Sequence, residues 1–212
     1  MISLSASGLE KRYGRRRVFR GVDLEVVGGQ SMAITGHNGS GKSTLARVLA
    51  GVLRPTRGSV SLTVDGVQIP KEERPFRTGL VAPYLNLYAQ FSPVENLRFI
   101  ARARQLDDRE ARIAQTLRLV GLVGREDDLV TTFSSGMVQR VRLAAAVLGE
   151  PDVLILDEPT SNLDEEGRTI VRRVIDEYRS AGKVVVVATN DAAEAAECDL
   201  ACAVAPDRAA AS

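Results

Sequence analysis

The sequence predicts an α/β fold in which a mainly parallel sheet is covered by helices. Two observations support this prediction. Short apolar runs typical of buried strands alternate with segments of helical periodicity, and this order builds a parallel sheet. In addition, the 212 residues are 44% hydrophobic and 26% charged, which is enough apolar material for a sizeable core. The formal net charge of +1 gives no overall attraction to nucleic acid or to anionic lipid, so no nucleic-acid partner is expected.

The N-terminal part of the chain is predicted to be rich in strands. Residues 2–27 contain short β-rich runs broken by Gly and Arg, which indicate two or three antiparallel strands. The elements predicted next are a strand at 31–35, a helix at 44–53, a hairpin at 59–69 and a strand at 78–82. The dipeptide Asp65-Gly66 places the hairpin, because it favours a two-residue turn between antiparallel strands.

The middle of the chain, about residues 86–150, is predicted to be a helical insertion. Its first helix begins after Ser92 as N-cap, and Glu95 completes a capping box with that residue. A third helix begins near Gly136. The second helix, between these two, carries apolar side chains at the spacing i, i+4, i+7, namely Ile113, Leu117 and Val120.

The C-terminal part returns to strands that alternate with helices. Residues 153–156 (VLIL) and 184–187 (VVVV) predict buried strands, joined by a helix over 166–182. The helix is expected to bury four side chains, those of Ile170, Val174, Ile175 and Tyr178. A short helix and a last strand near 200–204 complete the chain.

The location predicted from the sequence is the cytoplasm. The sequence contains no run of 18 apolar residues, and its start has no long apolar segment of the kind found in secretory signals. The sequence has two cysteines, Cys198 and Cys202, and they do not form a pattern typical of a disulfide framework or of a zinc site. We therefore expect both to be small core residues in a reducing compartment.

A phosphate-binding loop is the strongest functional motif. Residues 36–43 (GHNGSGKS) match G-x-x-x-x-G-K-[ST] between a predicted strand and a predicted helix. The glycines let backbone N–H groups turn towards a phosphate, and the helix directs its positive end at the same anion. Lys42 supplies a mobile positive charge, and the Ser43 hydroxyl is a hard ligand for Mg²⁺. The predicted nucleotide-binding residues are Gly36, Asn38, Gly39, Ser40, Gly41, Lys42, Ser43 and Thr44.

Two acids follow the apolar run at 153–156. Asp157 is predicted to hold Mg²⁺ through water, as in other phosphate-binding-loop enzymes. Glu158 lies one residue further and faces another direction, so it is predicted to polarise the attacking water. The alternative is an acidic loop without a role in chemistry, and the phosphate-binding loop upstream favours catalysis.

Together with further segments, these motifs resemble those of the ATP-binding cassette (ABC) ATPases over nearly the whole chain. Besides residues 36–44 and 153–159, the resemblance rests on Tyr13, on 133–141 (FSSGMVQRV) and on 161–164 (SNLD). It implies a P-loop NTPase of ABC type, with a parallel core sheet, an N-terminal antiparallel β-subdomain and a helical signature subdomain. The expected organisation is one domain over 1–212, with a core at about 1–85 and 151–212 and the helical subdomain at about 86–150.

The resemblance also implies roles for residues outside the phosphate-binding loop. Ser134, Ser135 and Gly136 resemble the signature segment, which closes over the γ-phosphate bound by a partner subunit, so that two ATP molecules lie inside a dimer. Residues 161–164 resemble the D-loop that crosses this interface. Tyr13 resembles the aromatic residue that stacks on adenine, and the alternative for Tyr13 is a buried core residue.

The sequence departs from the family pattern at three places. Ser135 and Met137 stand where the usual signature, Leu-Ser-Gly-Gly-Gln, has Gly and Gln. The family usually has Gln after the strand at 78–82, where this chain has Pro83 and Tyr84, with Asn86 and Gln90 nearby. The residue expected to be a switch histidine is Asn190, and the only histidine, His37, lies in the phosphate-binding loop, where we expect no catalytic role for it.

The resemblance implies an ATPase subunit of an ABC transporter that works as a dimer with itself or with a homologous ATPase. The expected cofactors are ATP and Mg²⁺, and the expected partners are separate transmembrane permease subunits at the cytoplasmic face of the membrane. Glu158 and Asn190 are the expected catalytic residues, and hydrolysis is expected to be slow because Asn carries no titratable proton at neutral pH. The signature variant resembles that of exporter-type subunits.

Alternative functions remain open at this point. One is a nucleotide-gated clamp that hydrolyses slowly, or a degenerate partner in a heterodimer, and the missing Gln and His favour it. A minor alternative is the haem-exporter ATPase of cytochrome c maturation, because this chain resembles that protein in its small size. A soluble ABC protein acting on DNA or ribosomes is less favoured, because such proteins usually carry two cassettes or a long coiled coil.

Overall fold

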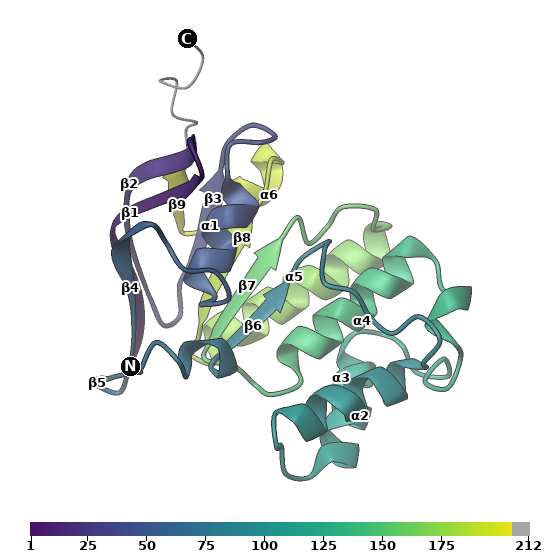
Figure 1. Cartoon of the computed structure of the whole chain (residues 1–212). Helices are drawn as coiled ribbons and strands as arrows, with labels where there is room; N and C mark the ends of the chain where they lie inside the picture. The colour runs from purple at the N-terminus through teal and green to yellow at the C-terminus, as the bar shows by residue number, and fades with distance from the viewer. Residues whose placement is uncertain (205–212) are drawn as a thin grey trace.

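The computed structural model describes residues 1–204 and contains two sheets with helices packed around them (Figure 1). The antiparallel sheet has the strand order β2-β1-β4-β5. Its strands are β1 (Ile2–Tyr13), β2 (Arg16–Val27), β4 (Arg57–Val64) and β5 (Val67–Gln68). The predicted N-terminal β-subdomain is therefore confirmed. The turn between β4 and β5 is Asp65-Gly66, with φ of 50° and 81°, the left-handed values that a two-residue hairpin requires.

The second sheet is parallel throughout and has the order β6-β7-β8-β3-β9. Its strands are β3 (Ser31–Thr35), β6 (Thr78–Val81), β7 (Val153–Asp157), β8 (Val184–Ala188) and β9 (Leu200–Ala203). Strands β7, β8 and β3 are neighbours although they lie far apart in the sequence. Their carboxyl ends therefore meet at one edge, where parallel α/β sheets bind ligands.

Six α-helices are present in residues 1–204: α1 (Lys42–Leu49), α2 (Pro93–Ala103), α3 (Arg109–Leu119), α4 (Ser135–Val147), α5 (Glu165–Ser180) and α6 (Ala192–Ala196). Two short 3₁₀ segments, Arg74–Phe76 and Val130–Thr132, accompany them. Helices α2, α3 and α4 form the lobe at the lower right of Figure 1, which agrees with the predicted helical insertion. None of the helices in the described residues has both the length and the apolar character needed to cross a membrane.

The predicted helix at 44–53 is four residues too long at its C-terminal end, because α1 ends at Leu49. The physical reason is Gly51, whose φ of 80° is left-handed and ends the helix. The capping box of α2 is confirmed, since the Ser92 side chain accepts from the Glu95 N–H and Glu95 accepts from the Ser92 N–H. In α5 the side chain of Ile175 is only partly buried, in contrast to the prediction.

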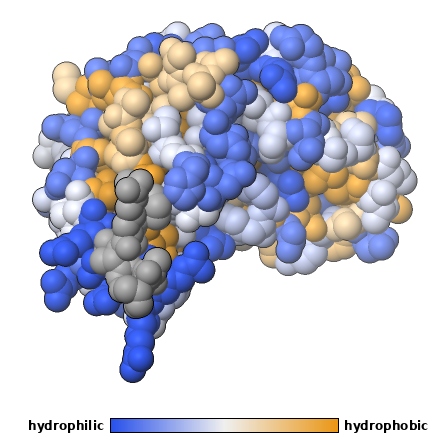
Figure 2. Space-filling model, turned by 90° about the horizontal axis from the view of Figure 1, so that it is seen from above, coloured by the Kyte–Doolittle hydropathy of each residue, from blue (hydrophilic) through white to orange (hydrophobic). Residues whose placement is uncertain are grey.

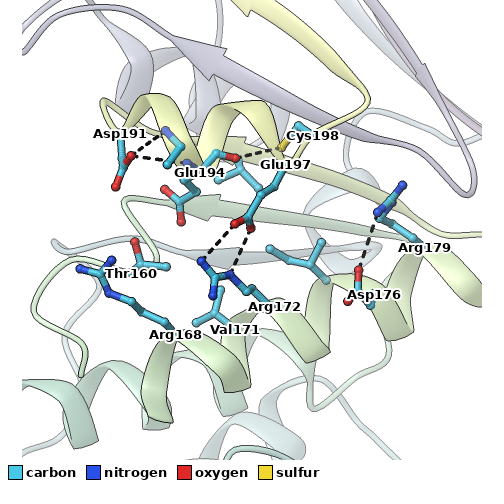
Figure 3. Close-up of a pocket in the computed structure, with 13 residues that line it drawn as sticks. Thr160, Arg168, Val171, Arg172, Asp176, Arg179, Asp191, Glu194, Glu197 and Cys198 are labelled. Carbon is cyan, nitrogen blue, oxygen red and sulfur yellow. Dashed lines mark hydrogen bonds and ion pairs between the residues drawn. The ribbon is translucent and has the colours of Figure 1, made fainter. Parts of the chain in front are cut away.

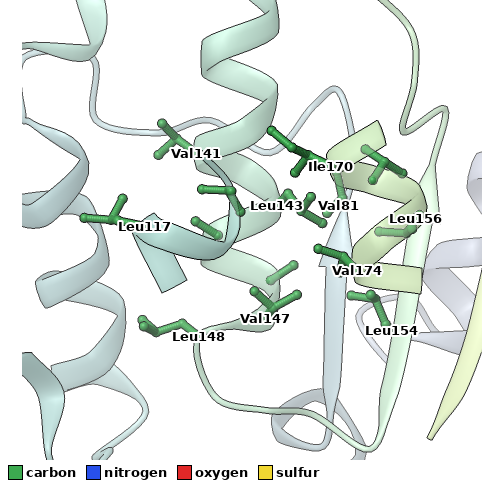
Figure 4. Close-up of a cluster of buried hydrophobic side chains, with 14 of the residues drawn as sticks. Val81, Leu117, Val141, Leu143, Val147, Leu148, Leu154, Leu156, Ile170 and Val174 are labelled. Atoms are coloured by element: carbon green, nitrogen blue, oxygen red, sulfur yellow. The ribbon is translucent and has the colours of Figure 1, made fainter. Parts of the chain in front are cut away.

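Alternate residues of the buried strands face two hydrophobic clusters, as the period of a strand requires. Val153 and Ile155 face the cluster that contains α1 and the antiparallel sheet. Leu154 and Leu156 face the cluster that contains α4, α5 and the rest of the helical lobe (Figure 4). The helical insertion thus shares its core with the parallel sheet, and no separate core divides them.

Candidate functional site

The phosphate-binding loop connects β3 to α1 at the carboxyl edge of the parallel sheet. Gly36, Gly39 and Gly41 have φ of 148°, 78° and 108°, which side chains other than glycine rarely adopt. A Cβ atom at Gly36 would lie 2.6 Å from the Ser40 Oγ, and one at Gly41 would lie 2.6 Å from Val18 Cγ1. The loop is therefore shaped by its glycines, and it leads into the positive end of α1, a geometry suited to a phosphate.

Lys42 is the first residue of α1, and its ammonium group turns back over the loop. Its Nζ donates hydrogen bonds to the carbonyl oxygens of Gly36 and His37, at 2.8 and 3.3 Å. The same atom lies 3.9 Å from Glu158 Oε1, and only 6% of the lysine is exposed. This cation is thus held next to the loop by carbonyl groups and by one carboxylate.

Ser43 and Asp157 form the predicted metal-binding pair. The Ser43 hydroxyl donates to Asp157 Oδ1 at 3.0 Å, which joins the start of α1 to the end of β7. The second carboxylate oxygen, Oδ2, is buried and has no hydrogen-bond partner among the described residues. Burial raises the pKa of Asp157, while Ser43, Lys42 and Arg47 oppose this shift. An unsatisfied carboxylate oxygen beside a hydroxyl is a donor set that fits Mg²⁺.

Glu158 follows at a point where the backbone changes direction. Its φ of 50° is left-handed, and its N–H donates to the Ala188 carbonyl at 2.8 Å, which ties it to the end of β8. Burial raises the pKa of this carboxyl, Lys42 lowers it, and Asp157 raises it further. The carboxylate of Glu158 therefore lies near Lys42, with Oε1 3.9 Å from the ammonium group.

Asn190 lies directly after β8 and contacts the phosphate-binding loop. Its Nδ2 donates to Asn38 Oδ1 at 2.9 Å, so two amides that are 152 residues apart meet at this edge. The N-cap of α6 is the next residue, Asp191, whose Oδ1 accepts from the N–H groups of Ala193 and Glu194 at 2.8 and 3.4 Å. The side chain of Asn190 is therefore not engaged in capping.

The signature segment is not part of this cluster. Ser134 caps α4, where its hydroxyl accepts from the Met137 N–H at 3.2 Å, and both Ser134 and Ser135 are exposed. A Cβ atom at Gly136 would lie 3.4 Å from the Asn162 carbonyl, so this segment packs against the predicted D-loop. Within residues 1–204, no hydrogen bond or ion pair joins the signature segment to the phosphate-binding loop.

Two other predicted residues lie near the surface. Tyr13, at the end of β1, is 50% exposed, and the Lys11 ammonium lies 5.0 Å from its ring centroid. The alternative of a buried core tyrosine is therefore wrong. His37 is exposed, and its Nδ1 lies 2.7 Å from the Asn38 carbonyl oxygen. Thr44 follows Ser43 in the first turn of α1 and is partly buried.

Sequence reasoning missed one contact at the site, the pair formed by Arg47 and Tyr84. The guanidinium carbon of Arg47 lies 3.7 Å from the Tyr84 ring centroid. Arg47 also lowers the pKa of Asp157, which shows that its charge acts on that carboxylate. The sequence could have indicated Arg47, because this residue comes four positions after Ser43 and so lies on the same face of α1.

A separate cavity of about 300 Å³ lies between α5 and α6 (Figure 3). Arg172 pairs with Glu197 at 3.0 Å, and Arg179 lies 3.7 Å from Asp176. Glu194 also lines the cavity, and burial raises its pKa. No residue of the phosphate-binding loop lines this cavity. The cavity is therefore not part of the cluster formed by Lys42, Ser43, Asp157 and Glu158.

Comparison with known proteins identifies a matching family model and several relatives of this chain. Residues 19–161 match the family model described as ABC transporter. The chain is 34% identical, over 91% of its length, to the Nod factor export ATP-binding protein I of Cupriavidus metallidurans, and covers 64% of that protein. It is 38% identical, over 89% of its length, to the aliphatic sulfonates import ATP-binding protein SsuB 1 of Mesorhizobium japonicum, and covers 69% of it. The chain spans 61% of the linearmycin resistance ATP-binding protein LnrL of Bacillus subtilis, with 32% identity.

Solved structures agree with the fold. A structure described as the ATP binding subunit of an ABC transporter has a TM-score of 0.83 and 28% identity, covering 95% of this chain and 85% of that one. A dimeric ATP-binding cassette in a post-hydrolysis state, bound to ADP and Pi, has a TM-score of 0.82 over 95% of this chain and 94% of that one. At 24% identity, the second likeness supports the fold alone.

Proposed function

This chain belongs to the ABC transporter family, and we propose from this premise that it binds and hydrolyses ATP to power a transporter through nucleotide-driven dimerisation. One observation supports the proposal above all others. Lys42 and Ser43 after β3 lie beside Asp157 and Glu158 after β7, with contacts of 3.0 Å from Ser43 to Asp157 and 3.9 Å from Lys42 to Glu158. The carboxyl edge of the parallel sheet therefore carries a cation for the phosphates, two oxygens for a metal ion and a base.

In the proposed mechanism, ATP phosphates take the place of the carbonyl groups that now hold Lys42. The loop N–H groups and the Lys42 ammonium bind the β- and γ-phosphates. Ser43 and Asp157 would hold Mg²⁺, which neutralises charge on the phosphate oxygens. Glu158, released from Lys42 by the phosphate, orients the attacking water and accepts its proton.

The second half of the site comes from a partner subunit, either a second copy or a homologous ATPase. Ser134, Ser135 and Gly136 of the partner present a hydroxyl and the positive end of a helix to the γ-phosphate. The two parallel strands β6 and β7 point upward in Figure 1, so Figure 2 views the molecule from the side of their carboxyl ends. Hydrophilic residues cover much of that face, with apolar groups between them, which favours a reversible, nucleotide-dependent contact.

Asn190 occupies the position of the switch residue in this proposal. Its amide group would turn from Asn38 to the γ-phosphate and act there as a neutral hydrogen-bond donor. A neutral donor supplies less stabilisation to developing charge than a protonated histidine does, so turnover is slow. The slow clamp is thus the second candidate function, and the neutral amide at residue 190 favours it.

The surface that would meet a membrane permease lies between the core and the helical lobe. A groove of about 310 Å³ is present there, and apolar residues of both parts line it, among them Val52, Leu80, Leu85, Leu87 and Ile100. The loop after β6, which lines part of the groove, and helix α2 also carry exposed aromatic residues, namely Tyr88, Phe91 and Phe99. We place the chain on the cytoplasmic face of the membrane, with separate transmembrane permease subunits docked at this groove.

The experiment that tests this function compares Glu158→Gln with the parental chain. The amide keeps the shape of the side chain but loses the base, so steady-state hydrolysis falls by about 10²-fold or more, while ATP binding persists. Light scattering during gel filtration with ATP and Mg²⁺ then shows a dimer of the variant. Glu72→Gln, an exposed change, is the matched control and leaves both measurements as they are.

Two further variants separate the parts of the proposal. Lys42→Ala removes the phosphate-binding charge and abolishes both nucleotide binding and the dimer. Gly136→Glu places a negative charge where the partner's phosphate lies, so it blocks the dimer and leaves nucleotide binding to the monomer unchanged. A Glu158→Gln chain that hydrolyses at the parental rate, or that stays monomeric with ATP, contradicts the proposal.

A further inference from the structure

Among residues 1–204, Arg47 forms no ion pair, and one carboxylate oxygen of Asp157 has no hydrogen-bond partner. Arg47 lies one helical turn after Ser43, whose hydroxyl contacts Asp157 at 3.0 Å. Among the described residues, Asp157 Oδ2 accepts no hydrogen bond, although a guanidinium is the usual partner of such an oxygen. The planar group of Arg47 instead lies on the Tyr84 ring, 3.7 Å from its centroid.

Tyr84 is fixed in place by a turn and by the helical lobe. Residues 82–85 form a β-turn, closed by the Leu85 N–H donating to the Ala82 carbonyl at 3.0 Å, with Pro83 at the position that favours such a turn. Arg142 of α4 donates from Nε to the Leu85 carbonyl at 3.0 Å. The backbone that carries Tyr84 is therefore held by two hydrogen bonds, and the Tyr84 ring offers one face to the guanidinium.

The same helix also reaches the loop after Glu158. Arg142 Nη1 donates to Gln139 Oε1 at 3.3 Å, and Gln139 Nε2 donates to the Pro159 carbonyl at 3.3 Å. The turn that carries Tyr84 and the loop that follows the two acids are thus attached to one helix. Helix α4 thus connects the turn of Tyr84 to the loop that follows Asp157 and Glu158.

We propose that Tyr84 is a positioning residue that holds Arg47 away from Asp157 and so keeps one carboxylate oxygen open for a divalent cation. The inference rests on the proposed function, in which Asp157 and Ser43 hold Mg²⁺. Without the ring, the flexible Arg47 side chain turns to Asp157 and forms a charge-assisted hydrogen bond with Oδ2. The guanidinium then competes with the metal for the same oxygen.

The test measures how nucleotide affinity depends on Mg²⁺, with a fluorescent ATP analogue and without turnover. Tyr84→Ala raises the Mg²⁺ concentration for half-maximal affinity by about 3- to 30-fold, the range of one cation–π contact. Tyr84→Phe keeps the ring and stays within about twofold of the parental chain. Tyr88→Ala, which removes an aromatic residue of the same loop that packs on Phe91 and Phe99, is the matched control.

The decisive variant is the double change Tyr84→Ala with Arg47→Met. It removes the competing guanidinium together with the ring, so the Mg²⁺ requirement returns to within about twofold of the parental value. Mn²⁺ binding is measured through the electron paramagnetic resonance signal of the ion. The affinities for Mn²⁺ rank the variants in the same order as their Mg²⁺ requirements. An unchanged Mg²⁺ requirement in Tyr84→Ala, or a shift that persists in the double variant, overturns the proposal.

The parental chain is measured first and separates this inference from the proposed function. A parental chain whose nucleotide affinity does not respond to Mg²⁺ contradicts the proposed function, and the inference falls with it. A parental chain that does respond, combined with an unresponsive Tyr84→Ala, contradicts the inference alone. Circular dichroism and the melting temperature of each variant show that the fold is retained.

Discussion

At the scale of single residues, the site depends on groups that hold each other in the absence of nucleotide. Lys42 lies on two carbonyl oxygens and near Glu158, and the amide of Asn190 donates to that of Asn38. Each of these contacts involves a group that the proposed mechanism assigns to a phosphate. In the proposed mechanism, nucleotide binding therefore replaces these contacts with hydrogen bonds to the charged phosphates.

Asn190 gives the first prediction at this scale. Asn190→Ala removes the neutral donor and lowers steady-state ATP hydrolysis by about tenfold or more, below the 10²- to 10³-fold effect of an ideal donor. Asn190→His raises hydrolysis by about tenfold, because imidazole can carry a proton near neutral pH. Gln115→Ala, a change at an exposed amide of α3, is the control. If neither substitution alters the rate while Glu158→Gln does, residue 190 has no part in the chemistry.

Asp157 gives a prediction about stability and pH. Burial raises the pKa of this carboxyl in the folded chain above its value of about 3.9 in an unfolded chain. The stability that it contributes is present at low pH and is lost as the pH rises through the folded pKa. At pH 7.5 the ionised group therefore destabilises the nucleotide-free fold, and Asp157→Asn raises the melting temperature.

Calorimetry without nucleotide checks this sign. We expect an increase of about 2–4 °C for each kcal/mol gained in a chain of this length. The difference between Asp157→Asn and the parental chain shrinks as the pH falls, because the parental carboxyl then takes up a proton. Asp127→Asn, at an exposed aspartate, serves as control. A lower melting temperature of Asp157→Asn at pH 7.5 contradicts the assigned direction.

Much of the residue-level site was predictable because the motif itself contains the physical requirement. The glycines of residues 36–41 need left-handed φ values, and the acids of 157–158 follow a strand of purely apolar residues. The contact between Arg47 and Tyr84 was not predictable, since it joins a helix to a turn 37 residues away without a motif. That contact depends on how the helical lobe packs.

At the scale of elements, the order of strands explains why distant motifs meet. Strands β3, β8 and β7 are adjacent, and each is followed by a residue of the site: Lys42, Asn190 and Glu158. Sequence periodicity predicts that these strands are buried, but it does not give their order in the sheet, which depends on crossover connections. The start of α2 was predictable, because its cap at Ser92 and Glu95 uses side chains that are close together in the sequence.

At the scale of the whole molecule, one hydrophobic cluster joins the helical lobe to the parallel sheet. Leu117 of α3 and Val141 of α4 belong to the same cluster as Leu154 of β7 and Val174 of α5 (Figure 4). A shared core means that the lobe cannot unfold without exposing apolar surface of the sheet. We therefore propose that residues 1–212 form one cooperative domain, although the chain contains an insertion of about 65 residues at 86–150.

This proposal predicts a single unfolding transition. Leu117 is 1% exposed, so Leu117→Ala leaves a cavity and lowers the free energy of unfolding by about 2–5 kcal/mol. Calorimetry shows one peak that moves as a whole, and hydrogen exchange quickens in β7 as well as in α3. Val123→Ala, at a residue that is 64% exposed, is the control. Two separate peaks, with only one moved by Leu117→Ala, contradict the proposal.

The packing of α2 has a consequence for how such proteins diversify. The inner side of this helix, with Leu97 and Ala101, is fully buried in the shared core, whereas Phe99 on its outer side is 50% exposed and touches Tyr88. Substitutions on the outer side change few core contacts. Under the proposed function, drift of these outer residues can change the membrane partner of a lineage, while selection on folding keeps the buried side of α2 and the residues of the ATP site unchanged.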